Sequence, residues 1–451
     1  MEFFNNLIDI ISGFFPFVLL ILCGLYLSFK GRFFQIKFFP KSIKAVVFAF
    51  KNRKQNQNKI TSLQAACTAL SATVGTGNIA GVASAISVGG AGAIFWMWVS
   101  AILGMAVKYS EIAIAVFFRK EKKGKFSGGP MYYIKEIKSK FKYLSPVFAF
   151  LLIPAAFCTG NITQTNAAIL SITDNFYIKL VLGIIFAFLV YAVILGGNEK
   201  IAVFTEKTIP FMSMFYIALC LGIIIINIDV LPKAFKMIFE GAFNPKAVTG
   251  GMIGSFLKVA TVGASRGVFS NEAGLGTSAI AHSEAFDANS KTQGLYGIFE
   301  VFVDTILICT LTALTIISSG VKIDYTSFAN ATLVGKAFSV NYGNLSVIIL
   351  AVMMCFFAFS SVIGWAVYGK SGSEFLFGKT GGKIFSGFYP LGSVMGAVFD
   401  VASVWKMAEF FNAIMLIINL SAILLLSDNI FKIIGDNDVS KKNRRTSKNI
   451  K

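Results

Sequence analysis

Long apolar runs separated by short polar or basic segments make up most of the chain. Each run is close to the ~20 residues that an α-helix needs to cross the hydrocarbon core of a bilayer. Such length with few charges predicts membrane-spanning helices rather than helices of a water-soluble core. The pattern predicts an all-α polytopic membrane protein with eleven transmembrane helices, at residues 7–29, 63–90, 93–118, 145–171, 178–197, 208–228, 250–275, 294–319, 344–368, 384–404 and 406–427.

Two of these spans contain clusters of glycine. The span 63–90 reads TVGTGN at its middle, and the span 250–275 reads TVGASRG. Glycine weakens a helix by about 1 kcal/mol relative to alanine, and non-helical backbone at membrane depth is tolerated only inside protein or beside a cavity. We expect both spans to be broken helices. The alternative interpretation is close packing of unbroken helices through small residues.

The positions of the two glycine-rich spans indicate an inverted repeat. With the first helix set aside, the other ten form two groups of five, and each group opens with a glycine-rich span. Five is odd, so the second group crosses in the opposite sense, as in secondary transporters whose site lies between discontinuous helices. We predict an extra helix with a basic cytoplasmic loop (1–62), two five-helix repeats (63–228 and 250–427) and a basic cytoplasmic tail (428–451).

Charge and composition agree with a membrane protein. Hydrophobic residues make up 55% of the chain and charged residues 14%, compared with about 25% charged in soluble domains. The net charge of +19 is concentrated in residues 30–62, 119–143 and 432–451. Lys and Arg gather in cytoplasmic loops, so we predict a multi-pass protein of the cell (inner) membrane, with the N-terminus outside and the C-terminus cytoplasmic. The charge then needs no nucleic-acid partner.

The sequence lacks the residue patterns of common enzymes. It contains one histidine, no nucleophile or phosphate-loop motif, and six cysteines that stand singly within apolar spans. Single buried cysteines are typical of packing residues. We therefore expect no enzyme activity and no cofactor apart from a coupling ion. A channel or a receptor is a remote alternative, because neither needs paired broken helices.

Broken helices offer a zwitterion both kinds of contact that it needs. The start of a half-helix presents free N–H groups and a positive dipole end, and its end presents carbonyls. We expect the first break to hold a carboxylate, since glycine lets the backbone approach closely, and the second to hold an ammonium group. The predicted contact residues at the breaks are Gly75, Thr76, Gly77, Asn78, Gly263, Ala264 and Gly267.

A sodium ion requires oxygen ligands without a strong local negative charge. Carbonyls freed by the first break near Ser71 and Val74, with the adjacent hydroxyls of Ser360 and Ser361, would supply them. The alternative for the two serines is hydrogen bonding to the carbonyl four residues earlier in their own helix.

Proton coupling is the main alternative to sodium. It usually requires a carboxylate or histidine inside the membrane, and Asp304 is the candidate. A structural ion pair with Arg266 or Lys258 is the other interpretation of Asp304. A proton-coupled amino acid carrier or exchanger is therefore the second function to test.

Several motifs together resemble the alanine or glycine:cation symporter family, also called sodium:alanine symporters. They are ALSATVGTGNIAG at the start of 69–111, GGPMYYI at 128–134, GNITQTNA at 160–167, RGVFSNEAGLGTSAIAH at 266–282, VDT at 303–305 and SSVIGWAVYG at 360–369. They run in family order over about two-thirds of the chain.

The resemblance implies a LeuT-like fold of five plus five helices with one extra N-terminal helix. It implies sodium-coupled uptake of a small neutral amino acid such as alanine or glycine. It also implies that Gln164 is a polar contact in the pocket and that Trp365 is its aromatic wall. From the residues alone, Gln164 would equally suit an interhelical hydrogen bond and Trp365 the membrane interface.

Overall fold

The structure is a computed structural model that describes residues 14–52, 59–122, 124–245, 249, 255–325 and 331–435. Within these ranges the chain is mostly helical, and one antiparallel hairpin joins β1 (Lys120–Lys122) to β2 (Lys125–Ser127). The first half contains α2 (Phe14–Lys30), α3 (Phe34–Lys51), α4 (Ser62–Thr73), η1 (Thr76–Asn78), α5 (Ala80–Gly89), α6 (Ala93–Phe117), α7 (Pro130–Lys135), η2 (Lys140–Tyr143), α8 (Leu144–Ala155), η3 (Ala156–Ile162), α9 (Thr163–Leu170), α10 (Phe176–Ile194), α11 (Gly197–Ile226), η4 (Ile228–Val230) and α12 (Leu231–Phe243). The second half contains α14 (Phe256–Asn271), α15 (Thr277–Ser283), α16 (Ser290–Val301), η5 (Phe302–Cys309), α17 (Thr310–Ser318), α18 (Ala331–Tyr342), α19 (Leu345–Phe388), α20 (Leu391–Val398), α21 (Val401–Leu425) and α22 (Ser427–Gly435).

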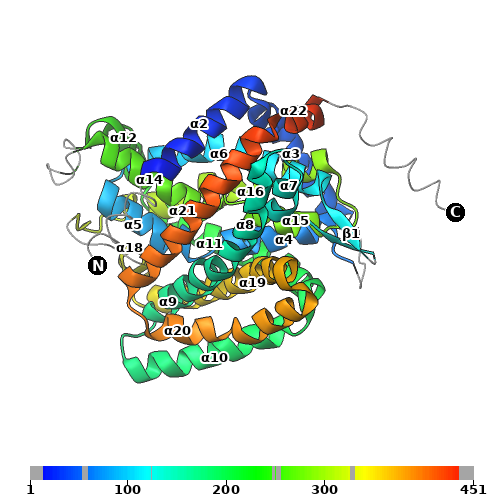
Figure 1. Cartoon of the computed structure of the whole chain (residues 1–451). Coiled ribbons are helices and arrows are strands. Elements are labelled where there is room, and N and C mark those ends of the chain that lie inside the picture. The colour runs from blue at the N-terminus through cyan, green and yellow to red at the C-terminus, as the bar shows by residue number, and fades with distance from the viewer. Residues whose placement is uncertain are drawn as a thin grey trace, which may run out of the picture.

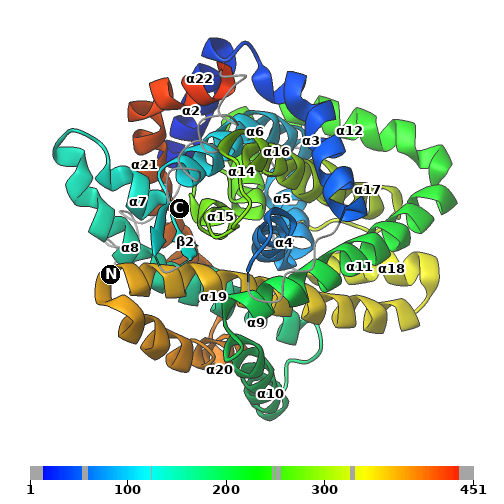
Figure 2. The ribbon, with the colours of Figure 1, turned by 90° about the vertical axis from the view of Figure 1, so that its right-hand side faces the viewer.

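The helices form a bundle around a central group. Among the described residues, seven helices are long and apolar enough to cross a membrane, and the number reaches nine if each of two bent pairs counts as one span. Figure 1 shows α2 and α21 side by side on one flank of the bundle. In Figure 2, α4, α5, α14 and α15 lie at the centre, ringed by helices that include α6, α11, α16 and α19. The first glycine-rich segment, residues 73–78, is fully buried at this centre, whereas the second, 261–267 in α14, is only partly buried.

The first predicted break is confirmed. Helix α4 begins with a capping box, in which the Thr61 hydroxyl accepts from the Gln64 N–H (3.2 Å) and the Gln64 side chain accepts from the Thr61 N–H (3.0 Å). The helix ends at Thr73, a short 3₁₀ turn follows, and α5 continues at an angle of 55° to α4. The backbone is extended at Gly75 (φ −139°, ψ −156°), which interrupts the helical ladder there.

The second predicted break is in the wrong place. Residues 263–267 lie inside the unbroken helix α14, and the chain leaves the helix only at Glu272, whose φ is +56°. Positive φ values at Gly274 (+89°) and Gly276 (+77°) carry the chain to α15. The interruption is therefore at 272–276. The first five residues of the predicted span, 250–254, lie outside the described residues.

Other predicted boundaries also need correction. The span 384–404 is not one helix: the chain kinks at Gly378 (φ +67°) inside α19, turns after Phe388 and continues as α20 and then α21. The span 208–228 corresponds to α11, which begins earlier, at Gly197. Segments predicted as loops hold the shorter helices α3, α12 and α18. Residues 7–13 of the first span are outside the described part.

Two helices widen locally into π-helix, and each widening contains or shortly precedes a residue that bonds to the first break. Segment η3 follows Pro154 near the end of α8, and η5 continues from α16. A proline removes a backbone donor, and π-bulges shift the side chains that follow them and are frequent at functional sites. These two segments position two side chains of the site. Gln164 is the second residue after the end of η3, and Asp304 lies within η5.

Candidate functional site

Gln164 completes the first break. Its Oε1 atom accepts hydrogen bonds from the Thr76 N–H (3.0 Å) and from the Thr76 hydroxyl (2.9 Å). The Asn78 side chain accepts from the Gly75 N–H (2.9 Å) across the same turn. Unpaired backbone groups in a buried helix end cost about 1–3 kcal/mol each, and these two amides remove that cost. Gln164 therefore contacts the predicted carboxylate site directly.

Asn78 connects the two broken helices. Its amide nitrogen donates to the Asp304 carboxylate (2.7 Å) and to the Ser270 hydroxyl (3.1 Å), and Ser270 also donates to Asp304 (2.8 Å). Thr305 supplies a further donor to the same carboxylate (2.7 Å). The first and second broken helices thus converge at Ser270, one turn beyond the predicted residues of α14.

Asp304 has a different role from the predicted ion pair. Within the described residues its carboxylate bonds to hydroxyls and an amide, whereas Arg266 pairs with Glu409 (3.1 Å). In the sequence, Asp304 could be recognised as a candidate because its carboxyl group lies inside an apolar span. Its partners Asn78 and Ser270 are far away along the chain, so only the fold brings them together.

The sodium candidates gather where α19 crosses α4. The Gly75 N–H, which a continuous helix would direct to the Ser71 carbonyl, bonds to Asn78 instead, and the Asn78 N–H bonds to the Gly75 carbonyl rather than to Val74. A Cβ on Gly75 would lie 2.3 Å from the Ser361 Oγ atom. The hydroxyl oxygens of Ser360 and Ser361 are buried and have no hydrogen-bond partner among the described residues. The bonding of these serines back to their own helix is therefore not seen.

Trp365 is a wall of the core and not a membrane-interface residue. Its side chain is fully buried and packs edge-on against Tyr368, with ring centroids 5.5 Å apart. Gly160 in η3 leaves the space that the indole occupies, because a Cβ there would lie 2.3 Å from the Trp365 Cβ. Trp365 and Gln164 thus come from helices that pack together, α19 and α9.

The predicted contact residues of α14 face another helix. A Cβ on Gly263 would lie 2.2 Å from the Ala93 carbonyl oxygen, and one on Gly267 would lie 2.4 Å from the Ser100 hydroxyl, both on α6. These glycines allow α14 and α6 to pack closely, which was the alternative interpretation. Ala264, between them in sequence, is fully buried in the same unbroken helix.

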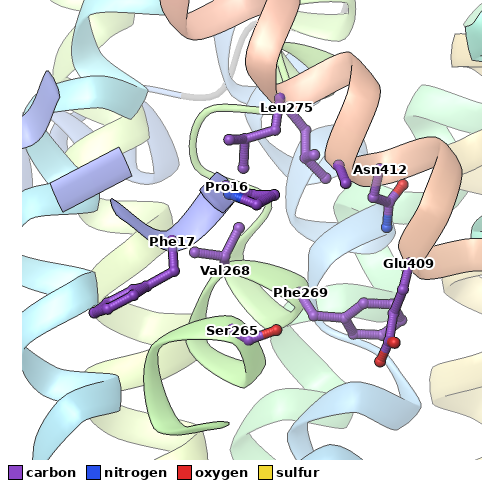
Figure 3. A pocket seen from close by; sticks show the side chains of 10 residues that line it. Pro16, Phe17, Ser265, Val268, Phe269, Leu275, Glu409 and Asn412 are labelled. Atoms are coloured by element: carbon purple, nitrogen blue, oxygen red, sulfur yellow. The ribbon is translucent and has the colours of Figure 1, made fainter. Parts of the chain in front are cut away.

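A small cavity of about 50 Å³ lies on the other side of α14, against α2 and α21. Figure 3 shows Ser265 and Phe269 of α14 facing Glu409 and Asn412 of α21 across it. Phe269 separates this cavity from the first break, since a Cβ on Gly77 would lie 3.7 Å from its ring. The Phe269 ring also packs on Trp405 of α21, with centroids 4.7 Å apart.

Apolar spanning helices around a buried, amide- and hydroxyl-lined helix interruption define a polytopic membrane transporter. The comparisons with known proteins agree with this class. The chain belongs to the sodium:alanine symporter family, whose model matches residues 1–451. This is a family of transporters.

Two relatives illustrate the range of the family. The chain is 38% identical to the sodium/alanine symporter AgcS of Methanococcus maripaludis, over 94% of each chain. It is 34% identical to the "Probable sodium/glutamine symporter GlnT" of Bacillus subtilis, over 94% of this chain and 88% of that protein. Among solved structures, a manganese transporter mutant of Eremococcus coleocola gives a TM-score of 0.47 at 15% identity, over 85% of this chain and 90% of that one, which is too weak to identify a shared fold.

Proposed function

We propose that this protein carries a small neutral amino acid, alanine or glycine, into the cell together with sodium by alternating access. The observation that carries the proposal is the crowding around Gly75. The Ser361 hydroxyl and the Gln164 amide oxygen both occupy the space of its missing side chain, at 2.3 and 2.8 Å from a Cβ there. An ion bound at Ser361 and an amino acid bound at Gln164 would share one residue of the broken helix. Neither could then bind without affecting the other.

Gln164 supports the carboxylate part of the proposal. Its carbonyl oxygen accepts from both the N–H and the hydroxyl of Thr76, which are the two donors that a carboxylate oxygen would use. The substrate carboxylate would take these bonds and release the Gln164 side chain to bind another part of the amino acid. Such an exchange costs little, because the two donors stay paired and the new acceptor is an ionised carboxylate rather than a neutral amide.

The size limit of the substrate follows from Trp365. The indole packs against Gly160 and Tyr368, and as the wall of the proposed pocket this rigid aromatic group would leave room for a small side chain only. Discrimination by such an apolar wall is about 1–3 kcal/mol per methylene. Alanine and glycine are therefore favoured over longer amino acids.

The cation part rests on the two serines. Hydroxyl oxygens that are buried without a partner lose the free energy of a hydrogen bond. A sodium ion would bind both hydroxyls together with the carbonyls of Ser71 and Val74. Binding there would link α19 to α4 and favour one of the two alternating states.

We also propose an eleven-helix, LeuT-like arrangement of five plus five helices after α2. Residues 345–398 form 54 residues of continuous apolar helix and turn, which is more than twice the ~20 residues of one crossing. Dividing this segment at Gly378 and counting the broken pair α14 and α15 as one span raises nine spans to eleven. The repeats are 63–228 and 250–427, with the N-terminus outside and the C-terminus in the cytoplasm.

Uptake of labelled alanine into proteoliposomes tests the proposal. An inward sodium gradient at equal pH should drive accumulation, and collapse of that gradient should abolish it. Accumulation driven by a pH gradient without sodium would refute sodium coupling and favour a proton-coupled carrier using Asp304. Excess unlabelled glycine should compete, and a lack of competition by any small neutral amino acid would refute the substrate class.

A further inference from the structure

Helix α6 carries two ionisable side chains in the interior of the bundle. Lys108 and Glu111 are both fully buried. They are three residues apart, so they lie on the same face of the helix. That face contacts both α14 and α15. Burying an ionisable group is costly unless polar groups surround it. The hydrogen-bond partners of Lys108 and Glu111 therefore indicate what the two side chains do in the bundle.

Lys108 is directed at the end of α14. Its ammonium group donates to the carbonyl oxygen of Asn271 (2.9 Å), the last residue of that helix, and to the hydroxyl of Ser278 at the start of α15. The C-terminal end of a helix carries a partial negative charge and unpaired carbonyls. A buried cation is the group that this end requires.

Glu111 is directed at the other side of the same interruption. Its carboxylate accepts from the N–H of Gly276 (3.2 Å), the residue that precedes α15. It also accepts from the Asn419 amide of α21 (3.0 Å), which in turn donates to the Gly274 carbonyl (2.8 Å). The N-terminal end of a helix carries a partial positive charge. Each end of the break therefore bonds to an ionisable side chain, the ammonium of Lys108 at one end and the carboxyl group of Glu111 at the other, and both side chains come from one turn of α6.

We propose that Lys108 and Glu111 are positioning residues that hold the 272–276 interruption in the shape required for transport. Their effect reaches the site through Ser270, which precedes Asn271 and bonds to Asn78 of the first break (3.1 Å). A shift of the α14 terminus would move Ser270 away from Asn78. The transport role rests on the proposed function, whereas the shape of the interruption can be measured without any substrate.

Hydrogen exchange measured by mass spectrometry on the purified full-length protein in lipid nanodiscs tests the first step. Glu111→Met removes the acceptor at similar size, and the amides of residues 272–276 should then exchange roughly ten- to hundredfold faster, as expected for loss of a hydrogen bond to a charged group. Glu111→Gln keeps an acceptor oxygen and should exchange at a rate between those of Glu111→Met and the wild type. The double variant Lys108→Met/Glu111→Met leaves no unpaired charge of this pair and should show the same increase, even if a single variant is too unstable to purify.

Alanine uptake tests the second step. A residue needed only for folding would lower the amount of transporter and hence the maximal rate, whereas a positioning residue raises the KM for alanine at equal protein level. We expect a KM increase of about tenfold for Glu111→Met and partial rescue by Glu111→Gln. Ser110→Ala is the matched control, since this buried serine on α6 bonds to the carbonyl of Ala106 in its own helix.

Unchanged exchange at 272–276 in Glu111→Met and in the double variant would overturn the proposal. So would an unchanged KM for alanine with a reduced maximal rate only. If the wild type takes up no alanine, the proposed function fails, and the exchange rates still decide whether α6 holds the interruption.

Discussion

Substitution of Gly75 by alanine is the most direct perturbation of the shared site. The added methyl group would lie 2.3 Å from the Ser361 hydroxyl and 2.8 Å from the Gln164 amide oxygen. The backbone at Gly75 has φ −139° and ψ −156°, a conformation that alanine adopts without strain. The whole effect is therefore steric, and it is directed at the proposed ion and substrate contacts together.

The magnitude follows from overpacking. Forcing a methyl group into a filled interior costs about 1–3 kcal/mol, and each 1.4 kcal/mol changes an equilibrium constant about tenfold. We expect Gly75→Ala to raise the KM for alanine and the half-saturating sodium concentration, each by roughly five- to hundredfold. Initial rates in proteoliposomes, titrated with alanine at saturating sodium and with sodium at saturating alanine, measure both.

Gly81→Ala is the matched control. Gly81 lies in the same broken helix, and a Cβ there meets no atom within 4 Å, so both constants should remain within about twofold of wild type. Removal of a helical glycine should also raise the melting temperature slightly. Wild-type constants in Gly75→Ala would refute the idea that ion and substrate meet at this residue. A change in only one of the two constants would refute their sharing of it.

Four further substitutions test separate parts of the site. Ser361→Ala should weaken the response of uptake to sodium by about tenfold at unchanged protein level, in a sodium titration. Gln164→Ala should raise the alanine KM roughly tenfold, because it leaves the Thr76 N–H without its partner. Gly160→Ala pushes on the Trp365 indole, and competition assays should show a loss of alanine uptake greater than the loss of glycine uptake. Burial raises the pKa of Glu284, in the segment after α15, from 4.5 to about 7. The folded carboxyl group binds its proton more tightly than the unfolded one, so the stability that it contributes at low pH is lost as the pH rises from 4.5 to about 7. The melting temperature of Glu284→Gln should not show this decrease over the same pH range.

The first break could be predicted from the sequence, and the second could not be placed correctly. TVGTGN and TVGASRG contain two glycines each, yet only the first interrupts a helix. Glycine serves two purposes in a membrane helix: it relaxes the backbone, and it allows close packing. At Gly263 and Gly267 it allows α6 to approach. The true interruption has positive φ at Gly274 and Gly276, and the motif EAGLG was the signal for it.

The contacts of the site required the fold for a different reason. Asn78 and Gln164 were predicted as site residues, Asp304 was named only as the candidate for proton coupling, and Ser270 was not predicted. The contacts of Asn78 with Ser270 and Asp304 join segments that are 192 and 226 residues apart, so the sequence alone does not reveal them. Hydropathy identifies long apolar helices, so it also missed the mixed-polarity helices α3, α12 and α18. A segment that lies along the bundle buries one side only and does not produce a long apolar run.

The two interruptions are stabilised by different chemistry, and this difference suits different tasks. Neutral amides of Gln164 and Asn78 complete the first, and a neutral hydrogen bond contributes only about 1 kcal/mol net, so a ligand can replace it. Ionisable side chains of α6 face the second, and removing one partner of a buried ion pair costs about 3–5 kcal/mol. Ligand exchange is therefore easier at Gly75 to Asn78 than at 272–276. If the proposed function is correct, bound alanine should change hydrogen exchange at the first break more than at the second.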